Sequence, residues 1–182
     1  MNCRWIPWLV LLLVASSAQW GCSGLPQGAG DAQQPIVALY DSRAVAIAFV
    51  GSEIFAESMK EIRREYDQAT AAGDGAILDR IQLMMQQRQK ELHAQGFGTA
   101  PVDEILEHYC EQLPMLLEEA GAFILISKWN EDALARHAGV TRIDLTVALI
   151  DLITDDPKQR RSALEILDQE PVAIEAIENH QD

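Results

Sequence analysis

The sequence is poor in basic residues. It has 14 Lys and Arg against 28 Asp and Glu, which gives a formal net charge of −14. Recognition of phosphate needs clustered Lys and Arg, so this balance argues against nucleic acid and anionic membrane surfaces as partners. The acidity is also what solubility alone would require, since a net charge far from zero keeps a protein in solution. Charge therefore excludes two classes of partner without identifying one.

Cysteine is scarce as well. The chain has 3 cysteines, Cys3, Cys22 and Cys110, too few for a disulfide framework. If Cys3 leaves with an export signal and Cys22 carries a lipid, Cys110 has no disulfide partner in the chain. We therefore expect Cys110 to remain a buried thiol.

A long hydrophobic run is also missing. Met1 to Arg4 is a short positive start, Ile6 to Ala15 is apolar, and Ser16-Ser17-Ala18 is small and polar. This order is typical of a secretory signal. The apolar run of about ten residues is too short for the roughly 20 that a membrane-spanning helix needs. The sequence predicts an exported protein with a signal peptide over residues 1–18.

Two cleavage sites remain open. Ser16-Ser17-Ala18 suits ordinary signal peptidase, whereas Gly21-Cys22 is placed as at a bacterial lipoprotein site and would extend the signal to residue 21. Gln19 and Trp20 stand where such a site usually has Leu and a small residue. The Gly- and Gln-rich residues 19–35 are expected to form a flexible tether. A lipid on Cys22 is the only membrane attachment expected, and one acyl chain binds a membrane marginally.

No catalytic signature is present. Ser42 lacks the flanking glycines of a nucleophile elbow. Glu104 and His108 are four residues apart and could share a divalent ion, but no matching pair supplies further ligands, so a solvated acidic face is the preferred interpretation. His93, His137 and His180 lie in separate polar contexts. We expect a non-enzymatic protein with no catalytic residue, cofactor or metal.

The remaining residues predict a strand that leads into a long helix. "IVALY", residues 36–40, is a short run rich in strand-forming residues, and Asp41 and Ser42 are both good helix N-caps. Arg43 could pair with an acid or face a partner chain. Apolar residues then recur at helical spacing to about residue 72. A helix over 43–72 would be about 45 Å long, too long for a compact domain, and should project.

The projecting helix is expected to return as a hairpin. "AGDGA", residues 72–76, is a turn signal, in which Gly73 and Gly75 allow positive φ and Asp74 can cap the next helix. A second helix follows over residues 77–94, and a third over residues 99–121 with a kink at Pro114. The predicted arm therefore covers residues 43–120.

Two further extended segments complete a small sheet. They are residues 122–129 and 140–143, after which Asp144 can cap a helix that ends near residue 153. The two main strands must pair, because neither can bury its apolar face alone. The predicted fold is α+β and mostly helical: a small β-sheet body, a long helical hairpin arm between its first two strands, and a helical C-terminal extension over residues 154–182.

Two segments are candidate contact surfaces. The start of the first helix is unusually poor in charge, and its residues Ala44, Ala48, Phe49 and Gly51 suit close packing against a second subunit. Met84-Met85 lies in a Gln-rich helix. It suits either an adaptable client-binding surface or the core of a coiled coil.

The chain resembles the Skp/OmpH family of periplasmic chaperones in three segments. "IVALYDSRAVA" is similar to the family's first strand and the entry to its arm. "GAFILISKWNEDALARHAGV" is similar to its second strand and the following loop. In "RIDLTVALIDLI", Asp144 and Thr146 open a helix after a short strand. The resemblance covers residues 36–153.

This resemblance implies a function. Three chains would form a β body, with arms around a cavity that holds unfolded outer-membrane proteins. We therefore expect a periplasmic chaperone-like homo-oligomer, a trimer by resemblance, that binds unfolded or partner proteins. The alternative is an envelope lipoprotein with a structural or assembly role and no chaperone activity.

Overall fold

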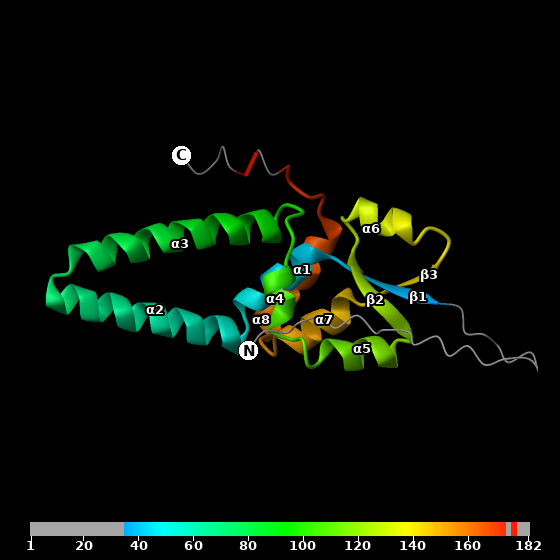
Figure 1. Ribbon diagram of the computed structural model, residues 1–182, viewed down its shortest axis with the longest axis horizontal. Coiled ribbons are helices and arrows are strands. Elements are labelled where there is room, and N and C mark those ends of the chain that lie inside the picture. The colour runs from blue at the N-terminus through cyan, green and yellow to red at the C-terminus, as the bar shows by residue number, and fades with distance from the viewer. Residues whose placement is uncertain (1–34, 174–175, 178–182) are drawn as a thin grey trace, which may run out of the picture. The chain divides into compact units, whose positions relative to one another are not determined.

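The structure, a computed structural model, describes residues 35–173 and 176–177 (Figure 1). The chain divides into the units Met1–Gln34 and Pro35–Asp182, and all the described residues belong to the second. The predicted signal, tether and lipidation residue Cys22 thus lie outside the described part. No helix in that part has the length and apolar character that a membrane crossing requires.

A three-stranded parallel sheet forms the body. β1 (Ile36–Tyr40) lies between β2 (Ala122–Ser127) and β3 (Thr141–Asp144). Ala38 stands opposite Leu125 on one side and Ile143 on the other. β1 can be apolar along most of its length because it is the central strand of a covered sheet. The predicted pairing of the two main strands is confirmed.

Helices make the crossover connections that parallel strands require (Figure 1). Between β1 and β2 lie α1 (Ser42–Val50), α2 (Glu53–Ala72), α3 (Gly75–Gly96), α4 (Asp103–Glu107) and α5 (Leu113–Glu119). Between β2 and β3 lies α6 (Glu131–Arg136), and after β3 come α7 (Thr146–Ile153), α8 (Pro157–Glu165) and a 3₁₀ turn, Ile166–Asp168. The predicted α+β, mostly helical fold is confirmed.

The helical hairpin consists of α2 and α3, which run side by side in opposite directions (Figure 1). Gly73 ends α2 with a φ of 67°, a left-handed conformation that favours glycine. The Asp74 side chain then caps α3 by accepting a hydrogen bond of 3.1 Å from the Ile77 backbone nitrogen. The predicted turn is confirmed, although among its two glycines only Gly73 has a positive φ.

The predicted single helix over residues 43–72 is wrong. α1 ends at Val50, and Ser52 caps a new helix by accepting a hydrogen bond of 3.1 Å from the Phe55 backbone nitrogen. Ser52 is buried, and its cap satisfies a backbone donor that would otherwise lack a partner at the start of α2. The arm therefore begins at Glu53, and α2 is about 30 Å long.

The predicted extent of the arm to residue 120 is also wrong. α4 ends at Glu107, and α5 begins only at Leu113 with Pro114 in its first turn, where proline starts a helix without kinking it. α4 contributes Ile105 to the buried core, and α5 packs against β2. The arm is therefore residues 53–96.

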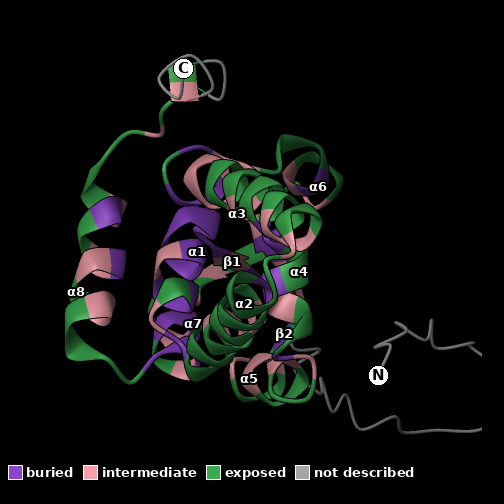
Figure 2. Ribbon diagram, turned by 90° about the vertical axis from the view of Figure 1, so that its left-hand side faces the viewer, coloured by how far each residue is buried: buried purple, intermediate pink, exposed green. Residues whose placement is uncertain are grey.

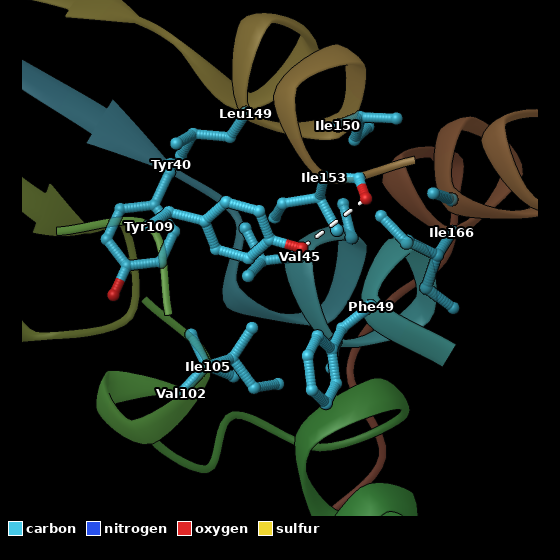
Figure 3. Close-up of a cluster of buried hydrophobic side chains, with 14 residues drawn as sticks. Tyr40, Val45, Phe49, Val102, Ile105, Tyr109, Leu149, Ile150, Ile153 and Ile166 are labelled. Atoms are coloured by element: carbon cyan, nitrogen blue, oxygen red, sulfur yellow. Dashed lines mark hydrogen bonds between the residues drawn. The ribbon is translucent and has the colours of Figure 1, made fainter. Parts of the chain in front are cut away.

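The core lies around α1, which is mostly buried, whereas α2 and α3 are mostly exposed (Figure 2). Small residues on α1 let α7 and α8 approach closely. Figure 3 shows Val45 and Phe49 of α1 among side chains from α4 and α7, with the Tyr109 hydroxyl 3.4 Å from the Ile153 carbonyl. One apolar cluster thus joins α1, α4, α7 and α8.

The predicted subunit interface on α1 is wrong, because this chain's own core covers it. Ala44 and Ala48 are fully buried, and Phe49 is 5% exposed. At Gly51 an added Cβ would lie 2.3 Å from Cγ of Gln159, so α8 covers that position. The scarcity of charge in α1 reflects burial inside one chain.

The described residues of the predicted helical C-terminal extension pack on the body, a point that the sequence left open. α8 packs against α1, and Ala163 and Ile166 enter the same core. The Thr154 hydroxyl also donates a hydrogen bond of 3.1 Å to the Gly51 carbonyl. The described residues of this segment up to Asp168 belong to the body.

Candidate functional site

Asp41-Ser42-Arg43 lies where β1 passes into α1. The N-cap of α1 is Asp41, whose side chain accepts a hydrogen bond of 3.0 Å from the Arg43 backbone nitrogen. The prediction of Ser42 as the cap is wrong, because Ser42 is the first residue of the helix. Its side chain is fully buried, and within the described residues its hydroxyl has no hydrogen-bond partner.

Arg43 pairs with an acid, which decides between the two roles left open for it. Its Nε and Nη2 donate to the Asp41 carboxylate at 3.1 and 2.9 Å, while Nη1 donates to the Gln169 backbone carbonyl at 2.8 Å. Asp41 and Arg43 are 0% and 1% exposed. Arg43 therefore forms a bidentate pair with Asp41. Its remaining nitrogen connects the start of α1 to the segment that follows α8.

Two residues after β2 complete this group, which we call the Asp41 cluster: Asp41, Arg43, Lys128 and Trp129. The Lys128 ammonium lies 2.6 Å from Oδ2 of Asp41, and the Trp129 indole donates to Oδ1 at 3.1 Å. The Arg43 guanidinium also lies 4.9 Å from the centre of the Trp129 ring, a cation–π contact. Nothing in the sequence pattern marks Lys128 or Trp129 as part of such a group. One signal from the topology was available, because parallel strands place their carboxyl ends at the same edge of a sheet. Tyr40 stands opposite Ser127, so the residues that follow β2 lie near Asp41, which follows β1.

The Asp41 cluster holds an ionised carboxylate. Burial raises the pKa of Asp41, but hydrogen bonds from Arg43, Lys128 and Trp129 outweigh it and hold the pKa below its usual value. Five donors, including the Arg43 backbone nitrogen, surround two oxygens that offer about four lone pairs. No acceptor capacity is left for a substrate, so the cluster is a structural joint.

Asp144 makes the local contact expected of it near the start of α7. Its carboxylate accepts a hydrogen bond of 2.8 Å from the Thr146 backbone nitrogen, although the N-cap position itself is Leu145. The Thr146 hydroxyl in turn accepts from the Asp41 backbone nitrogen at 3.0 Å. Side chains after all three strands therefore connect β1, β2 and β3 at one edge of the sheet.

The residues considered for metal binding have separate partners. Gln95 donates a hydrogen bond to Glu104, and the His108 ring stacks on Phe49 with 5.6 Å between the ring centres. Across residues 35–173 and 176–177, no three or more His, Cys, Asp and Glu side chains are grouped so as to hold a metal ion. Cys110 is disulfide-bonded, so the expectation of a thiol there is wrong. His180 lies outside the described residues.

An open hollow of about 1070 Å³ lies on the hairpin, and we call it the hairpin groove. Its apolar lining residues are Ala56, Met59, Ile62, Tyr66 and Ala71 of α2, with Ile81 and Met85 of α3. Tyr66 is 46% exposed although it lines the groove. The arm thus presents an apolar surface that the described part of the chain leaves uncovered.

The charged residues of the groove differ from those of the whole chain. Lys60, Arg63 and Arg64 line it, with Asp67 as the one acid in the lining. Their ion pairs are exposed: Lys60 with Glu57 at 3.0 Å, Arg63 with Asp67 at 3.4 Å, and Arg64 with Glu61. Such surface pairs contribute little and exchange easily. Each cation of the lining is therefore already paired with an acid of α2.

Met84-Met85 is divided between two environments. Met85 lines the hairpin groove, and Met84 is 39% exposed. Neither methionine is fully buried, and the choice between an adaptable surface and a coiled-coil core stays a prediction.

Comparison with known proteins supplies no function. No family model, no curated protein and no solved structure matches the chain. The resemblance to the Skp/OmpH family stays a prediction.

Proposed function

We propose that this chain is an exported cell-envelope protein that binds unfolded or partner proteins through its helical arm, as a periplasmic chaperone-like module. The observation that carries the proposal is the uncovered apolar groove on a hairpin whose base is firmly packed. Export and a place in the periplasm rest on the signal-like N-terminus. The clients expected by resemblance include outer-membrane proteins.

Burial along the arm supports a binding role. In α2, which has 20 residues, Ala69 is the one residue that is buried. Ile54, Tyr66, Leu83 and Met84 are large apolar residues that stay exposed on the two helices. The apolar residues that are gathered in one place are those lining the hairpin groove, and such a grouping is typical of sites that contact other proteins. Methionine at the groove adds a flexible side chain that can adapt to different partners.

The base of the arm supports the same role. α1 packs against α3, and Ser52 fixes the direction in which α2 leaves α1. The Asp41 cluster in turn holds the first turn of α1 to the sheet. Binding through the arm would therefore not require the body to rearrange.

The chaperone role is tested by aggregation of an unfolded client. An outer-membrane protein diluted from denaturant should scatter less light when the mature chain is present in equal or greater amount. Met59→Glu places a charge in the apolar lining and should weaken this effect several-fold. Met115→Glu makes the same change on α5, where Met115 is 70% exposed and lies outside the groove, and should leave it intact. Failure of the unaltered chain to reduce scattering would remove the chaperone role.

Self-association is a second part of the proposal and rests on the three similar segments. We expect light scattering coupled to size-exclusion chromatography to give the mass of a trimer for the mature chain. The residues once expected at the interface are inside the monomer, so α1 is not the contact. A monomer at micromolar concentration would contradict the trimer while leaving binding by a single arm possible.

A further inference from the structure

We propose that Met59 and Met85 are sites of reversible oxidation, and that a peroxide converts both to sulfoxides and so weakens binding in the hairpin groove. The inference rests on the proposed function, because the same groove does the binding, and it adds a redox control of that binding. It requires no particular occupant, since it concerns the side chains that line the groove and how polar they are.

Methionine in the described part of the chain lies at the surface. Its four positions there are Met59, Met84, Met85 and Met115. Met84 and Met115 are exposed, Met59 and Met85 are half-buried, and none of the four belongs to the two buried apolar clusters. Methionine often fills gaps in a hydrophobic core. Here every described methionine instead has a side chain that solvent, and a small oxidant dissolved in it, can reach.

Two of these methionines contribute to the two walls of the groove. Met59 lies on α2 and Met85 on α3. The large apolar side chains of the lining number five, and the other three are Ile62, Tyr66 and Ile81. A change of polarity at both methionines therefore alters a large share of the apolar lining. The alanines of the lining cannot compensate, because their side chains are a single methyl group.

Oxidation by hydrogen peroxide adds one oxygen atom to the thioether sulfur of methionine. The O–O bond of the peroxide breaks and an S–O bond forms, the sulfur loses two electrons, and the peroxide is reduced to water. The product is a polar sulfoxide in place of a flexible apolar side chain. Covering that sulfoxide with an apolar side chain of a client costs free energy, because the S–O group loses its hydration without gaining a hydrogen bond. Methionine sulfoxide reductases reverse the reaction, so the change can be undone.

Methionine is also the sulfur that the described part of the chain leaves open to reversible oxidation. Cys110 is the cysteine among the described residues, and it is disulfide-bonded, so it presents no thiol to a peroxide. The proposed export would place the chain in a compartment where disulfides form and persist. A redox signal there acts on the groove through Met59 and Met85.

Peroxide treatment of the mature chain tests the inference. Peptide mass spectrometry should find one added oxygen atom on Met59 and on Met85. Suppression of client aggregation should weaken several-fold, and the fluorescence of anilinonaphthalene sulfonate, a dye that binds exposed apolar surface, should fall with it. Circular dichroism should show unchanged helicity, and a methionine sulfoxide reductase should restore the dye signal.

Leucine variants supply the matched control, since leucine is close to methionine in volume and has no sulfur to oxidise. In the double variant Met59→Leu and Met85→Leu, peroxide should change neither the dye signal nor the suppression from their values before treatment. The double variant Met84→Leu and Met115→Leu removes the same number of methionines outside the groove lining, and it should respond to peroxide as the unaltered chain does. If the first double variant fails to fold, Met59→Leu alone should still reduce the response.

The outcomes separate this inference from the proposed function. Absence of the added oxygen on either residue, or a response that the variant Met59→Leu and Met85→Leu retains in full, would overturn the inference. Loss of helicity on oxidation would also overturn it, because unfolding would then explain the effect. Suppression of aggregation that peroxide leaves unchanged would leave the chaperone role standing alone. No suppression at any stage, with a dye response that requires both methionines, would leave the inference standing alone.

Discussion

Asp41→Asn is expected to lower the free energy of unfolding by about 3–5 kcal/mol at neutral pH. Asp41 and Arg43 are buried, and the carboxylate also faces the ammonium of Lys128. Removing its charge leaves the Arg43 guanidinium buried without a counter-ion, which costs far more than losing an exposed pair. Urea denaturation followed by circular dichroism measures the change.

Asp151→Asn is the matched control. It removes a carboxylate that is ion-paired with Arg160 at 2.6 Å, but both side chains are about half exposed. The expected loss is below about 1 kcal/mol. A cost for Asp41→Asn as small as that of Asp151→Asn would contradict the role of the Asp41 cluster as the joint between β1 and α1.

The same cluster gives the stability a pH dependence of known sign. The pKa of Asp41 is lowered in the folded chain, so the carboxylate stabilises the fold wherever it is ionised. Its contribution is complete above the pKa of an aspartate in the unfolded chain, about 3.9, and is lost as the pH falls through the lower folded value. The difference between the unaltered chain and Asp41→Asn should therefore narrow below about pH 4. A difference that stays constant over this range would mean that Asp41 is not ionised in the fold.

The sequence predicts several elements correctly because neighbouring residues alone determine where these elements begin and end. A run of strand-forming residues marks β1, and Gly73-Asp74 marks the hairpin turn through a left-handed glycine and a side-chain cap. Pairing of β1 with β2 follows from the need of two short apolar strands to be covered. None of these inferences requires knowing which distant residues meet.

Features set by distant contacts could not be predicted. The scarcity of charge in α1 fits a subunit interface and an internal core equally well, and the docking of α8 decides between them. The break at Gly51-Ser52 is an exception, because it has a local signal in Ser52, a good helix N-cap. In the sequence, Lys128 and Trp129 resemble the end of a strand. Their contact with Asp41 depends on the parallel register of β1 and β2, which the sequence does not specify. The hairpin groove is lined by residues of both α2 and α3, and only the pairing of the two helices brings those residues together.

Leu149→Ala is expected to lower the free energy of unfolding by about 2–5 kcal/mol. Leu149 lies on α7, is fully buried, and belongs to the apolar cluster that surrounds α1 (Figure 3). Truncation removes apolar contacts and leaves a cavity that the packed helices can fill only in part. Val147→Ala shortens a side chain on the same helix that is 45% exposed, and should cost well under 1 kcal/mol.

Leu149→Ala also tests whether the base and the arm are separable. Leu149 supports α1 from the side of α7, whereas the groove is lined by α2 and α3 alone. Under conditions where the Leu149→Ala chain is still folded, it should reduce client aggregation as well as the unaltered chain does. A weaker reduction by the folded variant would mean that packing in the body sets the spacing of α2 and α3. In that case the body would take part in binding, and the groove could not be treated as a surface of the arm alone.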